Sequence, residues 1–167
     1  MIFLTVGSEL PFSRLTTAVD GWAALHKDQR VFGQIGKCDN GDKLPTTIEY
    51  SQLLAPEVYS KNLEDCSVMV AHAGMGSIIS ALTIGKPIVI MPRREMFHET
   101  RNDHQVGTAQ KFASRPSVFV ANDETEISSA MDAALIFSKE KSQITEPVSE
   151  FADEEFLKKL RSFIKGT

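Results

Sequence analysis

The stretch VMVAHAGMGSIISALTIGKPIVIMPRR, Val68 to Arg94, determines how the rest of the sequence is interpreted. A continuous apolar run leads into a glycine-rich turn from His72 to Ser77, and an apolar segment with helical spacing follows. After a glycine break the chain returns to a second apolar run. This succession of strand, tight turn, helix and strand is typical of a parallel α/β unit.

The same alternation extends along the whole chain. Apolar residues recur with helical spacing after Pro11 and after Asp123. Six short runs rich in β-branched residues have the character of buried strands, and they span 2–6, 31–35, 47–54, 67–73, 87–91 and 117–121. Buried strands separated by helices predict an α/β, Rossmann-like fold, with a mostly parallel sheet of about six strands and helices on both faces.

Composition limits the possible functions. At 167 residues, 42% hydrophobic and 24% charged, the chain is long enough for one α/β domain and too short for two of ordinary size. Its net charge of −4 is spread along the sequence, so we expect no nucleic-acid partner. Cys38 and Cys66 suggest neither a disulfide framework nor a zinc site, which favours a cytoplasmic protein. The first apolar run is too short for a signal peptide or membrane span, so we expect the chain not to cross a membrane by itself.

Two loops are candidates for a ligand site, because ligands of open α/β sheets bind outside the carboxyl ends of the strands. Glycines in such loops let the backbone approach a ligand, and the first turn of a helix has unpaired amides that suit an anion, most often phosphate. A purely structural turn, with Ser77 capping the helix, is the alternative. The candidate residues are Gly7 and Ser8 in the first loop and Gly74, Met75, Gly76 and Ser77 in the second.

A polar segment, RREMFHETRNDHQ at 93–105, follows the fifth predicted strand. Placed at the carboxyl edge of the sheet, it would lie beside the glycine turn and offer hydrogen bonds to a polyhydroxylated ligand. The alternative is a solvated loop with a helix starting near Asp103. Its candidate binding residues are Arg93, Glu99, Asn102, His104 and Gln105.

Several sharper motifs do not fit the spacing. The dinucleotide fingerprint requires a third glycine where this chain has Ile79, although Arg93 and Arg94 lie where an NADP-binding domain could hold a 2′-phosphate. A G-x-S-x-G nucleophile turn is absent from the quoted stretch. His98 and His104 do not have the spacing of a zinc helix, and no D-x-D occurs, so we expect no metal.

Three segments together resemble a known family: TVGS at 5–8, AHAGMGSIISALTIGKPIVIMPRR at 71–94 and NDHQ at 102–105. They are similar to the C-terminal, donor-binding half of family-28 glycosyltransferases. The resemblance is greatest to the split enzymes whose halves are separate chains, namely the eukaryotic dolichol-linked N-acetylglucosaminyltransferase and bacterial exopolysaccharide glycosyltransferases.

The resemblance implies half of a GT-B fold that binds a UDP-sugar and transfers the sugar with inversion, with neither a metal nor another cofactor. It implies that Gly74 to Ser77 contact the diphosphate opposite Ser8, and that His104 and Gln105 contact sugar hydroxyls. His72 either bonds the phosphate or sugar, as a tentative catalytic residue, or only ties down the turn. The backbone of Ser51 to Leu54 would face the uracil. Because Ser80 stands where relatives often carry a ribose-binding glutamate, Ser80 or Glu99 would hold the ribose.

The acceptor site of complete GT-B enzymes lies on the other half, so the resemblance also implies partners. We expect a membrane-anchored subunit that binds a lipid-linked saccharide acceptor and holds this chain at the inner face of the membrane. We expect residues 1–145 to form the nucleotide-sugar-binding domain and 146–167 a linker and amphipathic helix that docks on the partner, the alternatives being packing on this domain and contact with an anionic membrane. An NADP-binding domain and a noncatalytic nucleotide-sugar-binding partner protein remain alternative functions.

Overall fold

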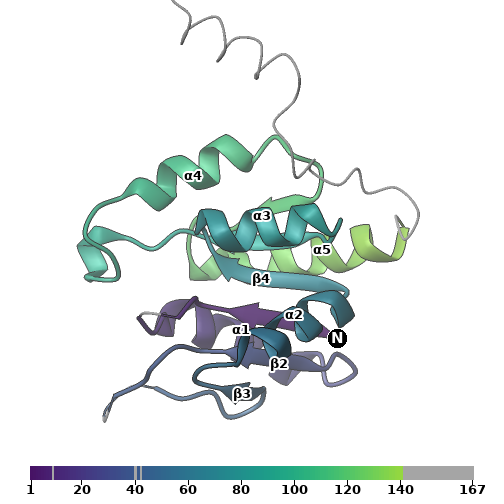
Figure 1. Ribbon diagram of the computed structural model, residues 1–167, viewed down its shortest axis with the longest axis horizontal. Helices are drawn as coiled ribbons and strands as arrows, with labels where there is room; N and C mark the ends of the chain where they lie inside the picture. The colour runs from purple at the N-terminus through teal and green to yellow at the C-terminus, as the bar shows by residue number, and fades with distance from the viewer. Residues whose placement is uncertain (9, 40, 42, 141–167) are drawn as a thin grey trace, which may run out of the picture.

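Six parallel strands form a single sheet in the computed structural model, which describes residues 1–8, 10–39, 41 and 43–140. The strand order is β3-β2-β1-β4-β5-β6, and each of the five neighbouring pairs is parallel. The strands are β1 (Ile2–Thr5), β2 (Val31–Gln34), β3 (Glu49–Ser51), β4 (Val68–His72), β5 (Ile88–Met91) and β6 (Val118–Val120) (Figure 1). The predicted sheet is therefore confirmed.

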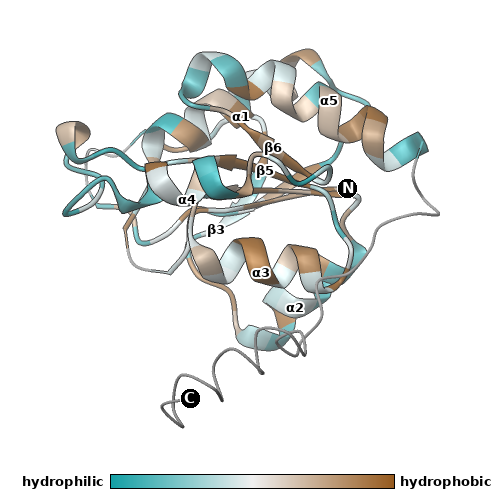
Figure 2. Cartoon of the chain, turned by 90° about the horizontal axis from the view of Figure 1, so that it is seen from above, coloured by the Kyte–Doolittle hydropathy of each residue, from teal (hydrophilic) through white to brown (hydrophobic). Residues whose placement is uncertain are grey.

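Helices cover both faces of the sheet (Figure 2). One layer consists of α1 (Ser13–Leu25) and α5 (Ile127–Glu140), and the other of α2 (Pro56–Asp65), α3 (Met75–Thr83) and α4 (His104–Phe112). Two short 3₁₀ helices, η1 (Glu95–Phe97) and η2 (Glu124–Glu126), precede α4 and α5.

The sheet has a hydrophobic core on each side because its strands are apolar on both faces. Along β1, Ile2 and Leu4 pack with the α1 and α5 layer, whereas Phe3 packs with the α2, α3 and α4 layer. All three side chains are fully buried. The continuous apolar runs of the sequence therefore become strands buried on both sides.

The second helical layer contains the main element that the sequence analysis did not identify. Helix α2 begins at Pro56, where a proline is tolerated because the first helical amide needs no partner, and only Leu63 of this helix is buried. One buried position gives little periodic signal. The strand expected at 47–54 is correspondingly shorter, because the chain leaves the sheet after Ser51 to enter α2.

The order of the strands reverses between β1 and β4, and this reversal positions the candidate site. From β1 the chain builds outward through β2 to β3, returns to place β4 on the other side of β1, and continues outward to β6. The helices leaving β1 and β4 lie on opposite faces, which opens a crevice at the carboxyl ends of these two strands. Gly7 follows β1 and Gly74 follows β4, so the two predicted loops meet at this crevice.

All six strands and the five helices described above lie within residues 1–140. The linker and amphipathic helix expected at 146–167 lie outside the described residues. No helix within the described part of the chain combines the length and apolar character that a membrane span requires.

Candidate functional site

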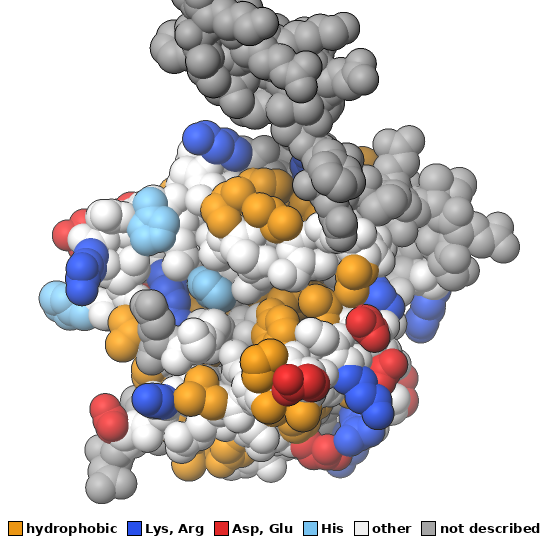
Figure 3. Space-filling model, in the orientation of Figure 1, with side chains coloured by type: hydrophobic (Ala, Val, Ile, Leu, Met, Phe, Trp, Pro, Cys, Tyr) orange, Lys and Arg blue, Asp and Glu red, His pale blue; other side chains and the backbone are white. Residues whose placement is uncertain are grey.

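A cavity of about 760 Å³ lies at the crevice between β1 and β4. Its walls come from the loop after β1, the end of β4 and the segment between β5 and α4. Figure 3 shows histidine side chains and side chains of Lys or Arg on one side of the molecule. The lining residues are Val6, Gly7, Ser8, Leu10, His72, Arg93, Glu99, Thr100, Arg101, Asn102, His104 and Gln105. The structure thus brings together the first loop, His72 and the polar segment.

The imidazole of His72 packs between two glycines. A Cβ added to Gly74 would lie 2.2 Å from Nε2 of His72, and one added to Gly7 would lie 3.1 Å from Cε1. Gly7 also has a φ of 88°, a conformation that residues with a side chain rarely adopt. Both glycines are therefore needed, because a side chain at either position would collide with the imidazole ring.

The surroundings of His72 keep its ring neutral. Burial, and then the positive charge of Arg93, lower the pKa of His72 to about 4. The backbone of Thr5, in hydrogen-bond contact with the ring, acts in the opposite direction and raises the pKa, but burial and Arg93 outweigh it. Nδ1 itself is fully buried and has no partner with good hydrogen-bond geometry among the described residues.

The glycine turn presents the N-terminus of α3 beside His72. Gly74 is the N-cap residue, and the described residues supply no side-chain cap. Helix geometry leaves the first amides, those of Met75, Gly76 and Ser77, without partners inside the helix. A Cβ added to Gly76 would meet no atom within 4 Å, so the space in front of this turn is open.

Ser77 does not cap the helix, so the structural alternative of a capping serine is wrong. Its side chain is buried and in hydrogen-bond contact with the hydroxyl of Tyr59. Ser77 can therefore offer an anion its backbone amide but not a freely exposed hydroxyl. Neither Ser77 nor the rest of the glycine turn belongs to the residues that line the cavity.

The segment from Ser51 to Leu54 uses several backbone groups to hold the edge of the sheet. The carbonyl of Ser51 accepts from the amide of Ile35 at 3.0 Å, and the amide of Leu54 donates to Oε1 of Gln34 at 2.9 Å. The carbonyl of Gln52 likewise accepts from Gly36. These groups have partners within the fold, and the segment does not line the cavity.

Arg93 holds the first loop. Its guanidinium donates to the carbonyls of Val6 at 2.9 Å, Leu10 at 2.6 Å and Pro11 at 2.8 Å. The residue is only 5% exposed, and its guanidinium carbon lies 4.7 Å from the centre of the Phe12 ring. Because its donors serve these carbonyls, Arg93 is not placed to bind the 2′-phosphate of NADP.

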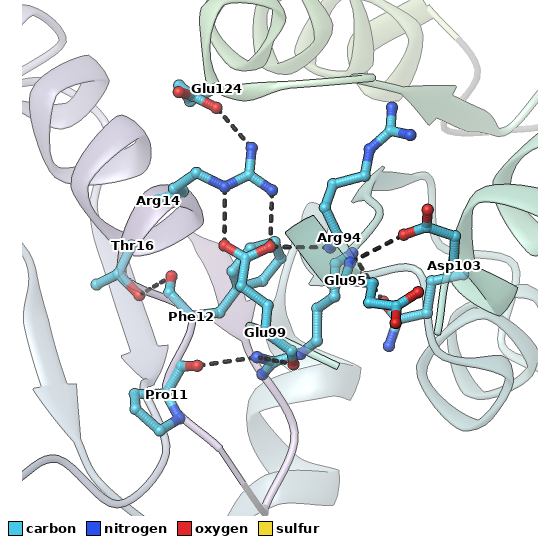
Figure 4. A network of polar contacts seen from close by, with 11 residues as sticks. Pro11, Phe12, Arg14, Thr16, Arg94, Glu95, Glu99, Asp103 and Glu124 are labelled. Atoms are coloured by element: carbon cyan, nitrogen blue, oxygen red, sulfur yellow. Dashed lines mark hydrogen bonds and ion pairs between the residues drawn. The ribbon is translucent and has the colours of Figure 1, made fainter. Parts of the chain in front are cut away.

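Glu99 forms an ion pair with Arg14 of α1 (Figure 4). Arg14 donates from Nε to Oε1 and from Nη2 to Oε2, each at 2.8 Å, and the amide of Arg94 donates to Oε2 at 2.9 Å. A carboxylate has about four lone-pair positions, so at most about one acceptor position remains. The two hydroxyls of a ribose would need two acceptor positions, so Glu99 cannot bind both.

Gln105 has a defined orientation at the start of α4. Its Oε1 accepts from the amide of Arg93 at 3.1 Å, which fixes the oxygen and directs the NH₂ group elsewhere. No bond of that NH₂ group is found within the described residues, and Gln105 lines the cavity. His104 lies one residue earlier and pairs through Nδ1 with the side-chain oxygen of Asn102. A helix, α4, does start directly after Asp103, as the alternative interpretation of this segment had it, and its first residues still line the cavity.

The sequence matches a protein family over most of its length. The model of the glycosyltransferase family 28 C-terminal domain matches residues 1–159. The chain belongs to this family. No match was found among curated protein sequences.

Solved structures of glycosyltransferases share the fold of this family-28 domain. The glycotransferase of kitacinnamycin is 23% identical with a TM-score of 0.61, and the match covers 99% of this chain and 39% of that protein. The calicheamicin glycosyltransferase CalG4 is 18% identical with a TM-score of 0.57, over 85% of this chain and 37% of that one. ALG13 is 19% identical with a TM-score of 0.53, over 96% of this chain and 94% of its own. The chain thus spans about two fifths of the first two proteins, and these similarities support the Rossmann-like half of a GT-B fold.

The described part of the family-28 domain has no group of three or more His, Cys, Asp and Glu side chains that could hold a metal ion. The cavity-lining residues that the sequence analysis did not name as candidates are Val6, Leu10, Thr100 and Arg101, and it also did not single out Arg14, which pairs with the cavity-lining Glu99. One local signal was available, because Arg14 places a positive charge in the first turn of a helix that has no acidic residue there.

Proposed function

We propose that this family-28 domain is the donor-binding subunit of a two-chain glycosyltransferase that transfers a sugar from a UDP-sugar to a lipid-linked acceptor. One observation carries the proposal: His72 lies between Gly7 and Gly74, beside the uncapped N-terminus of α3 and a large cavity. A helix N-terminus with open backbone amides suits a diphosphate, and the cavity next to it suits a sugar.

The chemistry of the leaving group explains why such a turn is useful. When the sugar departs, UDP gains negative charge on its diphosphate. The amides of Met75, Gly76 and Ser77, at the positive end of the α3 dipole, would stabilise that charge without a metal. A hydrogen bond to a charged group contributes about 1.5–3 kcal/mol, so a few such bonds could accelerate transfer by several powers of ten.

The neutral state of His72 defines what this residue can do. With a pKa of about 4, the imidazole is uncharged near pH 7, so it acts as a directional hydrogen-bond partner of the phosphate or sugar and not as a cation. The NH₂ group of Gln105 is the donor we assign to a sugar hydroxyl. The base that deprotonates the acceptor would belong to the acceptor subunit.

The partner and location follow from the GT-B arrangement, in which two Rossmann-like halves enclose donor and acceptor. We propose a membrane-anchored subunit that binds a lipid-linked saccharide and recruits this chain to the cytoplasmic face of the membrane. No cofactor beyond the donor is required. NADP binding is disfavoured because the buried Arg93 serves backbone carbonyls.

The direct test places a carboxylate at the diphosphate position. Gly76→Asp should weaken UDP binding at least tenfold in calorimetric titration, because the added charge would repel the diphosphate while its side chain meets open space. Gly21→Asp is the matched control, since Gly21 is also an exposed helical glycine with no atom within 4 Å of an added Cβ.

Unchanged UDP affinity in folded Gly76→Asp would contradict the assignment of the diphosphate to this turn. Titration of the wild-type chain with NADPH separates the dinucleotide alternative, which predicts binding of NADPH in preference to UDP. Transfer of sugar by the chain together with its partner subunit separates a catalytic subunit from a noncatalytic binding protein.

A further inference from the structure

Two arginines connect segments around the cavity in opposite directions, and Figure 4 shows one of them, Arg14, bonded to Glu99. Arg93, just after β5, reaches the carbonyls of the loop between β1 and α1. Arg14, at the start of α1, reaches Glu99 in the segment between β5 and α4. The loop after β1 is therefore held by an arginine that follows β5, and the segment that follows β5 is held by an arginine of α1, which does not itself line the cavity.

The pair between Arg14 and Glu99 is well ordered by its geometry. Two parallel bonds of 2.8 Å join the guanidinium to the carboxylate, and the two side chains are only 17% and 12% exposed. Bidentate pairs of this kind are stronger and more directional than single contacts. Glu124 accepts a further bond from Arg14 at 2.6 Å, and the Phe97 ring lies 4.4 Å from the guanidinium carbon.

Arg14 is unfavourable for its own helix. The first turn of α1 has no acidic residue, its N-cap Phe12 makes no side-chain capping bond, and a cation there opposes the helix dipole. Carboxylates from positions 85 and 110 residues away offset this disadvantage. A residue that breaks a local preference and is compensated only by tertiary contacts often marks a functional site.

Glu99 also closes the turn that it ends. Its Oε2 accepts from the amide of Arg94 at 2.9 Å, and its own amide donates to the carbonyl of Arg94 at 3.3 Å. The preceding residue, His98, has a φ of 56°, an unfavourable conformation for a residue other than glycine. Glu99 therefore holds the turn internally, while Arg14 holds it against α1. The residues that follow, Thr100 to Asn102, line the cavity.

We propose that Arg14 and Glu99 are positioning residues: their ion pair fixes residues 94–103 against α1, so that Asn102, His104 and Gln105 face the donor sugar. This inference rests on the proposed function. It assigns Glu99 to the protein's own Arg14 and not to the ribose, because three of the carboxylate's acceptor positions are already used.

Two measurements on the full chain test the pair. Amide hydrogen exchange without ligand reports how firmly residues 94–103 are held, and calorimetry reports the dissociation constants of UDP and a UDP-sugar. Arg14→Gln should accelerate exchange in 94–103 about tenfold or more while leaving β1, β4 and β5 unchanged. It should also weaken binding of the UDP-sugar up to about tenfold, the loss expected when about one hydrogen bond to the sugar is no longer made.

Matched variants isolate the ion pair. Arg14→Lys keeps the charge but loses the bidentate geometry, so its effect should be intermediate. The double variant Arg14→Gln/Glu99→Gln should weaken binding by less than the product of the two single effects, because the ion pair is already lost in each single variant. Arg30→Gln removes the exposed pair with Glu49, whose side chains are 66% and 63% exposed, and should leave exchange and affinity within about twofold of wild type.

The outcomes distinguish the two proposals. If folded Arg14→Gln shows unchanged exchange and unchanged affinity, the positioning role is overturned. If Glu99→Gln weakens binding and Arg14→Gln does not, Glu99 contacts the donor itself and the role is again overturned. If the wild-type chain binds neither UDP nor a UDP-sugar, the proposed function fails, while the exchange measurement still decides whether Arg14 holds the segment.

Discussion

The protonation state of His72 follows from its position between two glycines and near Arg93. Its pKa of about 4 in the folded protein lies below the value of 6.5 expected in the unfolded chain. The unfolded chain therefore binds a proton between pH 6.5 and pH 4 that the folded protein does not bind, so stability falls as the pH is lowered through this range.

Between pH 7 and pH 5 this linkage should remove about 2 kcal/mol from the free energy of unfolding. Urea unfolding at both pH values checks the expectation, with His72→Gln as the variant that should lack this component of the loss. In NMR spectra, the imidazole signals of His72 should not titrate between pH 5 and pH 8. A midpoint near 6.5 would show that the ring is not desolvated as described.

Gln105 permits a sharper substitution than removal of its side chain. Gln105→Glu keeps an oxygen to accept from the amide of Arg93 but loses the NH₂ donors. We expect the affinity for a UDP-sugar to fall about tenfold and the affinity for UDP to fall less, because the lost donor serves the sugar whereas the added charge repels both ligands.

Calorimetric titration with both ligands checks this. Equal losses for UDP and the UDP-sugar would contradict a role limited to the sugar. Gln105→Ala is the comparison, because it removes both the donor and the acceptor and leaves the amide of Arg93 unpaired. Only Gln105→Ala should therefore also lower thermal stability.

Among the elements, α1 connects several parts of the fold through polar side chains. Asp20 accepts from the amides of Thr46, Thr47 and Ile48, which ties the middle of α1 to the chain entering β3. Burial alone would raise the pKa of Asp20, but these donors outweigh it and lower the pKa. The ionised carboxylate of Asp20 therefore stabilises the fold above its pKa in the unfolded chain, near 4, and this stabilisation is lost as the pH falls below that value.

Asp20→Ala should lower the free energy of unfolding by about 1–2 kcal/mol at pH 7, as expected for loss of a residue that caps backbone amides. The difference from wild type should shrink below pH 4, and urea unfolding over this range measures it. Asp28→Ala is the control, because the hydrogen bond of its exposed carboxylate is to the neighbouring Gln29. A difference that persists undiminished well below pH 4 would contradict the role of the charge.

Prediction of elements from the sequence succeeded where burial is periodic. Strands β1, β4 and β5 and helices α1, α3 and α5 each place several apolar residues in a core, so their patterns are visible in the sequence. Helix α2 buries only Leu63, and its presence became evident only from the structure. The glycine turn was predictable from the sequence as a loop. Why position 74 must be glycine became evident only from the structure, because the ring of His72 occupies the space that a side chain there would need.

For the whole molecule, the prediction concerns the C-terminal residues 151–167, which lie outside the described residues. Their apolar residues at helical spacing lead us to expect docking on the partner subunit. Because all six strands and the five helices described above lie within residues 1–140, a chain lacking 151–167 should fold and bind UDP. It should lose co-purification with the partner.

Circular dichroism, UDP titration and co-purification check the three parts of this prediction. A truncated chain that still co-purifies and transfers sugar at the full rate would refute the docking role. A truncated chain that does not fold would show that these residues pack on this domain.

The sequence by itself determined the type and order of the main elements, the parallel sheet and the two loops at its carboxyl edge. These features are local, since each depends on the spacing of apolar residues and glycines within one segment. Only the tertiary structure decided that Arg93 serves the first loop and that Glu99 belongs to Arg14, 85 residues away. The physical reason is that strand order brings distant segments to one edge, where a polar side chain bonds the partner nearest in space and not in sequence.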